Sequence, residues 1–227
     1  MVSFLRRWPF WLEFLVVVGA AFGYFAASSI YAALHPDLLF KPHHSAGSLI
    51  ALGVIETVVG GILCLFLMAR GWTLSRLGLK PTLAETGIGL GLGVLAYVAY
   101  IVAFIAFATM FPALADQARN LNVLPVGGMP LATALIIPWI NALYEELFVA
   151  GYIITALKDT RGVQVAINVS VVIRLTYHLY QGAFGVIAII PLGLLLGYWY
   201  AKNGKLWPLI VAHAAIDLVG FLAKVQY

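Results

Sequence analysis

The feature that most constrains this chain is a series of separate apolar runs, each long enough to cross a bilayer. A membrane-spanning helix needs about 20 residues. Only 10% of the 227 residues are charged, against about 25% in soluble domains. We therefore predict an all-α, polytopic membrane helix bundle of about seven transmembrane helices. Their approximate ranges are 9–34, 47–69, 83–111, 130–157, 163–179, 184–201 and 206–223.

The segments between these runs support the division into helices. "KDTRG", "YQGAFG" and "KNGK" are short turns of the kind that join antiparallel neighbours. The longest polar gap is "FPALADQARNLNVLPVGGMP", and it separates the first three helices from the last four. The stretch "GIGLGLGVLAY" predicts close helix packing through small residues. We expect a single membrane domain over residues 1–227.

Lysine and arginine indicate how the chain is oriented, because cytoplasmic loops carry an excess of them. If the N-terminus lies inside, the inner face carries Arg6, Arg7, Arg70, Arg76, Lys80, Lys158, Arg161, Lys202 and Lys205. The outer face then carries only Lys41, Arg119 and Lys224. This excess predicts an inner N-terminus and an outer C-terminus. It also accounts for the net charge of +4, so we expect no nucleic acid partner.

Several ionisable side chains lie inside the predicted spans, where a charge costs about 2.5–3.5 kcal/mol at the helix centre. From a rise of 1.5 Å per residue, Glu145 lies about 20 Å from the inner turn, His178 about 25 Å and Asp217 about 18 Å. Three helices thus place polar groups at similar depth, as an intramembrane site requires. The full set is Glu56, Glu145, Glu146, Arg174, His178, His213 and Asp217.

The spacing of these residues indicates which of them share a helix face. Arg174 and His178 are four residues apart, and so are His213 and Asp217, so each pair lies on one face. Glu145 and Glu146 are about 100° apart around their helix. We therefore expect one carboxylate to face a cavity and the other to face a neighbouring helix.

Three stretches together resemble a known family. "EELFVAGYI", "RLTYHLYQG" and "LWPLIVAHAAID" are similar to the successive motifs of the CAAX-protease and bacteriocin-processing family, also called the Abi family, whose members are intramembrane proteases. The resemblance covers about residues 131–222, and implies a catalytic core of four helices preceded by an N-terminal three-helix part, residues 1–130. It also implies an integral protein of the bacterial inner membrane.

The resemblance assigns a role to each matching residue. Glu145 would be the general base that activates a water, and His178 would help position that water. His213 with Asp217 would stabilise the oxyanion of the tetrahedral intermediate. The family is regarded as glutamic, which implies no cofactor. A zinc site of Glu145, His178 and His213 is the less favoured alternative, because the chain has no His-Glu-x-x-His helix and the ligands would come from three helices.

Two positions depart from the family pattern. Ala150 stands where the first motif has arginine, and Arg174 stands where the second has phenylalanine. We hypothesise that the missing guanidinium comes from the next helix, with Arg174 pairing with Glu146. An ionised Asp217 would repel an oxyanion, so we expect it to orient His213 instead.

Other functions stay open at this point. The first is a non-catalytic scaffold or immunity protein of the same fold, which Ala150 favours. The second is a proton-coupled transporter, since buried Glu and His chains also relay protons, although no inverted repeat is visible. The expected partners are the lipid bilayer and a peptide or membrane-protein substrate, prenylated or not. The sequence gives no oligomeric state and no role for Glu56.

Overall fold

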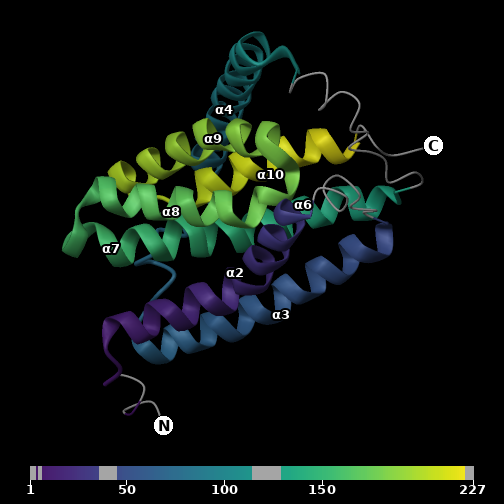
Figure 1. Ribbon diagram of the computed structural model, residues 1–227. Coiled ribbons are helices and arrows are strands. Elements are labelled where there is room, and N and C mark those ends of the chain that lie inside the picture. The colour runs from purple at the N-terminus through teal and green to yellow at the C-terminus, as the bar shows by residue number, and fades with distance from the viewer. Residues whose placement is uncertain (1–3, 5–6, 36–44, 114–128, 223–227) are drawn as a thin grey trace.

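The computed structural model describes residues 4, 7–35, 45–113 and 129–222, and within them the chain forms helices and no strand. Figure 1 shows α2 and α3 on one side of the bundle, with α6 to α10 on the other. The elements are α2 (Phe10–Leu34), α3 (Ala46–Arg70), α4 (Leu83–Met110), α6 (Leu131–Glu145), η1 (Glu146–Tyr152), α7 (Ile153–Arg161), α8 (Val163–His178), η2 (Leu179–Gln181), α9 (Gly182–Asn203) and α10 (Trp207–Leu222).

The predicted helices are present, and local sequence explains where they begin and end. Ser45 caps α3 by accepting a hydrogen bond from the Ser48 backbone N–H at 3.1 Å. Thr82 caps α4 in the same way through Glu85 N–H at 3.2 Å. Gly71 and Gly204 follow α3 and α9 with φ of 94° and 63°, a left-handed conformation that favours glycine at helix ends.

Five helices of the described part of the chain are long and apolar enough to cross a membrane: Phe10–Leu34, Ala46–Arg70, Leu83–Met110, Leu131–Arg161 and Gly185–Asn203. Helix α8 has 16 residues, and α10 has 16 within the part of the chain that the structure describes; this is about 24 Å at 1.5 Å per residue, shorter than the hydrocarbon core of about 30 Å. Only five of the seven predicted spans are therefore long enough by this criterion within the described residues, and the count of seven stays a prediction. The orientation stays a prediction, since Lys41, Arg119 and Lys224 lie outside the described residues.

The predicted helix 130–157 is not a uniform α-helix. It runs to Arg161 and contains a π-helix, η1, from Glu146 to Tyr152. A π-helix leaves backbone carbonyls without their usual partners, and hydroxyl groups from other helices approach two of them. Ser170 donates to the Val149 carbonyl at 2.7 Å, and the Tyr200 hydroxyl lies 3.3 Å from the Gly151 carbonyl. Such π segments occur frequently at functional sites.

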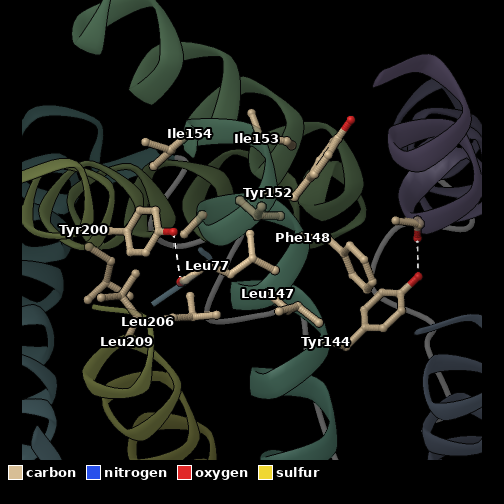
Figure 2. Close-up of a cluster of buried hydrophobic side chains, with 14 of the residues drawn as sticks. Leu77, Tyr144, Leu147, Phe148, Tyr152, Ile153, Ile154, Tyr200, Leu206 and Leu209 are labelled. Atoms are coloured by element: carbon tan, nitrogen blue, oxygen red, sulfur yellow. Dashed lines mark hydrogen bonds between the residues drawn. The ribbon is translucent and has the colours of Figure 1, made fainter. Parts of the chain in front are cut away.

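The core of the bundle surrounds η1, whose seven residues are all buried. Figure 2 shows Tyr144 and Phe148 on one side of this segment, and Tyr200 and Leu206 on the other. The Tyr144 hydroxyl donates to the Ala21 carbonyl of α2 at 2.8 Å. The π-helix is therefore held from both sides, and the position of Glu146 at its start is fixed by packing.

A second buried network lies where α2 and α3 meet the end of η1. Glu13 of α2 accepts hydrogen bonds from Arg70, from the Trp72 indole at 2.9 Å and from the Tyr152 hydroxyl at 3.1 Å. Its carboxylate thus has partners on both oxygens. We name these four residues the Glu13 network, and it ties the N-terminal helices to the core.

The glycine-rich stretch of α4 makes the close contact that the sequence predicts. A Cβ at Gly89 would lie 2.7 Å from the Pro208 carbonyl oxygen, and a Cβ at Gly93 would lie 3.2 Å from the Ala212 carbonyl oxygen. Both partners belong to α10, so only residues without side chains allow this approach. The following part of α4 projects away from the other helices (Figure 1).

Candidate active site

The centre of the site is a buried cluster of three side chains from three elements. Arg174 of α8 donates to Glu146 Oε1 of η1 at 2.7 Å. His213 of α10 places Nδ1 2.7 Å from the same oxygen. Since a carboxylate oxygen accepts, Nδ1 is the donor in this contact. Because both side chains contact this one oxygen, Glu146 holds Arg174 and His213 together. Glu146 itself is fully buried, at 0% exposure.

Glu145 lies beside this cluster with a different set of partners. Its Oε2 accepts a hydrogen bond from the Tyr177 hydroxyl at 2.6 Å and lies 3.5 Å from Arg174 Nη1. Its Oε1 lies 3.3 Å from the side-chain amide of Asn141, one helical turn earlier in α6. Both carboxylate oxygens are thus oriented by protein groups.

His178 ends α8 at the half-buried edge of the site. Its Nδ1 lies 2.9 Å from the Arg174 backbone carbonyl, which is an acceptor, so Nδ1 carries the proton. The Nε2 atom is then an acceptor in the neutral ring. No hydrogen bond among the described residues joins His178 to Glu145, although the two interact electrostatically. His178 is therefore close to Glu145 without being fixed to it.

Asp217 lies at the ring nitrogen of His213 that does not face Glu146, and its expected role in orienting that ring stays a prediction. Its Oδ2 lies 3.5 Å from His213 Nε2, longer than the 2.7–3.2 Å typical of such hydrogen bonds. Glu146 makes the closer contact, at 2.7 Å on the opposite ring nitrogen. Glu146 therefore fixes the imidazole, and the half-buried Asp217 stands at the outer side of the ring.

The two adjacent glutamates differ in accessibility as well as in partners. Glu146 is fully enclosed, whereas 7% of Glu145 is exposed. The pairing of Arg174 with Glu146, hypothesised from the absence of arginine at position 150, is confirmed by their 2.7 Å ion pair. Glu145 is thus the less enclosed residue of the pair, although both are buried.

The structure brings all six sequence-predicted residues to one region: Glu145, Glu146, Arg174, His178, His213 and Asp217. Sequence reasoning missed Asn141 and Tyr177, both of which bind Glu145. Asn141 stands four residues before Glu145, a spacing that places both on one helix face. That signal was available. For Tyr177 there was none beyond its position next to His178.

The histidines and carboxylates of this region do not converge as metal ligands. In the part of the chain that the structure describes, no group of three or more His, Cys, Asp or Glu side chains is arranged to hold a metal ion. The ring nitrogens of His213 both face carboxylates, Glu146 and Asp217. The zinc set of Glu145, His178 and His213 is therefore not assembled in this arrangement.

Residues 127–219 match the family model described as type II CAAX prenyl endopeptidase Rce1-like. This part of the chain is similar to that family. The match contains all three motifs, so the resemblance to the CAAX-protease and bacteriocin-processing family is confirmed over these residues. The Rce1-like family is a protease family, and the apolar helices make the chain a membrane protein. No curated protein and no solved structure matches the chain.

Proposed function

We propose that this protein is an intramembrane endopeptidase that hydrolyses a peptide bond of a membrane-associated substrate with a water activated by Glu145. The observation that supports it best is the division between the two glutamates. Glu146 is enclosed by Arg174 and His213, whereas Glu145 is oriented beside them by other partners and is the less enclosed of the two. This arrangement lies inside the segment that matches a protease family.

In this mechanism Glu145 removes a proton from the attacking water as the water oxygen bonds to the scissile carbonyl carbon. The same carboxyl group then gives that proton to the leaving nitrogen as the C–N bond breaks. Tyr177, Arg174 and Asn141 hold the carboxylate during both steps. A fixed base is effective because its correct orientation is set before the reaction begins.

The two histidines act on the attacking water and on the oxyanion. His178, with Nδ1 held by the Arg174 carbonyl, turns Nε2 to the water. His213, held by Glu146 at Nδ1, would donate Nε2–H to the oxyanion, which shares that nitrogen with the nearby Asp217. Loss of one oxyanion donor reduces turnover by about 10²–10³. Asp217 stands near Nε2 and would support the ring in its protonated form.

The family description supports a prenylated CAAX peptide as substrate. We therefore test the proposal with an internally quenched peptide that carries farnesyl-cysteine followed by three residues. Wild-type protein in nanodiscs should cleave it, and Glu145→Gln should lower kcat by about 10²–10⁴, because the amide cannot accept the proton. Glu85→Gln is the matched control, since Glu85 is a buried glutamate of α4 paired with Lys205 at 3.3 Å.

Three further parts of the proposal are the bacterial inner membrane, an inner N-terminus, and catalysis without a cofactor. Activity that survives strong chelation supports the last of these, whereas loss that Zn²⁺ restores contradicts it. Reporter fusions at the two termini test the orientation.

A non-catalytic relative of the same fold is the second candidate. It is favoured by the partners of Glu145, since both of its oxygens already contact protein groups. Wild-type protein that binds the farnesylated peptide without cleaving it would support this alternative.

A further inference from the structure

Glu56 is a buried acid that none of the family motifs includes. It lies on α3, outside residues 127–219, and is only 4% exposed. Its Oε1 accepts a hydrogen bond from the Asn141 side-chain amide at 2.9 Å. The same amide nitrogen lies 3.3 Å from Glu145 Oε1. One amide group thus connects two carboxylates from two helices.

A role in packing alone does not explain a glutamate at this position. Its second oxygen, Oε2, is buried and has no hydrogen-bond partner within the described residues. Burial of an unsatisfied polar group in an apolar span is unfavourable. A leucine would fill the space between α3 and α6 without that penalty. What a leucine could not supply is the acceptor for Asn141, and this hydrogen bond is what distinguishes Glu56 from a packing residue.

The geometry shows what that task is. A primary amide has two N–H groups, and the terminal torsion of asparagine is broad, so a single partner does not fix it. With Glu56 on one side, the amide of Asn141 is held in the orientation that meets Glu145. The other oxygen of Glu145 is held by Tyr177 at 2.6 Å. The Glu145 carboxylate is therefore fixed at both ends, and one end depends on α3.

We infer that Glu56 and Asn141 are positioning residues, and that Glu56 orients the Glu145 carboxylate through the amide of Asn141. The inference rests on the proposed function, because orientation matters only if Glu145 acts on a water. It adds an N-terminal helix to a site that the family match confines to the last helices. Glu56 also interacts electrostatically with Glu145, His213 and Asp217, which places it at the same site.

The test measures kcat and KM of the farnesylated quenched peptide for a set of variants in nanodiscs. Glu56→Leu removes the acceptor, and we expect kcat to fall on the order of 10- to 100-fold with KM unchanged. Glu56→Gln keeps a carbonyl oxygen for Asn141 and should recover most of that loss. Glu85→Leu, a buried glutamate with a similarly unpartnered oxygen, is the control and should keep wild-type kcat.

A double variant separates positioning from an independent effect. Asn141→Ala should lower kcat as Glu56→Leu does, and the two changes together should cost no more than the larger one alone, because both break the same connection. If Glu56→Leu does not fold, Glu56→Asp takes its place in the test. Its side chain is shorter by one methylene, so the acceptor moves away from Asn141 and kcat should fall in the same way.

The inference fails if Glu56→Leu, or Glu56→Asp in its place, keeps wild-type kcat. It also fails if Glu56→Gln is as impaired as Glu56→Leu, or if the losses from positions 56 and 141 multiply. These outcomes differ from failure of the proposed function. That failure would appear as no cleavage by wild-type protein, or as full activity in Glu145→Gln.

Discussion

Two buried ionic networks in this protein differ in whether all of their carboxylate oxygens have partners among the described residues. In the Glu13 network one carboxylate meets Arg70, Trp72 and Tyr152, and both of its oxygens have partners. In the site, the acids outnumber Arg174, and two buried carboxylate oxygens, on Glu56 and Glu146, have no partner among the described residues. The acids of the site are Glu56, Glu145, Glu146 and Asp217.

The difference shows which network serves stability and which serves chemistry. A closed network satisfies every buried group, so its contribution is to hold helices together. A network with surplus acceptors is less favourable for folding and retains the capacity to bind a water or a substrate group. Substitutions that break the Glu13 network should therefore change stability without changing turnover, whereas those that break the site should change turnover, with a further loss of stability where a buried ion pair is lost.

The largest effect is expected from Arg174→Ala, which removes the cation that both glutamates share. It leaves Glu146 fully buried without its ion pair, and such a loss destabilises by about 3–5 kcal/mol. Thermal unfolding in detergent measures this loss, and the peptide assay should show loss of cleavage. Adding Ala150→Arg, which restores the arginine of the family motif, should recover both. Failure of the double variant to recover either property would contradict the exchange of arginine positions.

A smaller effect on stability is expected from Glu13→Gln. The amide keeps one acceptor oxygen but loses the charge that Arg70 binds, so unfolding should become easier by about 1.5–3 kcal/mol. The kcat for the farnesylated peptide should not change, because the Glu13 network is separate from the site. A loss of kcat in protein that remains folded would contradict the separation of the two networks.

The smallest effect is expected from Tyr177→Phe, which removes one hydrogen bond to Glu145. The ring should stay in place, since it stacks on Phe22 with centroids 5.0 Å apart. We expect kcat to fall about 3- to 10-fold, equivalent to about 0.5–1.5 kcal/mol, with little change in unfolding temperature. An unchanged kcat would show that this hydroxyl does not help to orient the base.

The sequence predicted the helices and most of the site for physical reasons. Apolar runs and their caps determine helix boundaries locally, so Ser45, Thr82 and Gly71 act as their types suggest. The cost of charge in a bilayer made Glu145, Arg174 and His213 conspicuous, and their depths and spacings brought them together. The pairing of Arg174 with Glu146 followed from two complementary departures in neighbouring motifs.

Other features depend on contacts between helices that no local pattern reveals. The π-helix at Glu146 is accompanied by hydroxyl groups of Ser170 and Tyr200 from other helices. Glu146 makes the closest carboxylate contact to His213, at Nδ1. This contact depends on where η1 places the Glu146 carboxylate. The partner of Glu56 could not be predicted either, because Asn141 lies 85 residues away along the chain.

The central claim is that Glu145 activates water to cleave a peptide bond. The most direct test compares protein termini in membranes of cells that carry wild-type protein, Glu145→Gln or the control Glu85→Gln. We predict new termini with wild type and with the control, and none with Glu145→Gln, at equal amounts of folded protein. Identical termini with wild type and with Glu145→Gln would contradict the account.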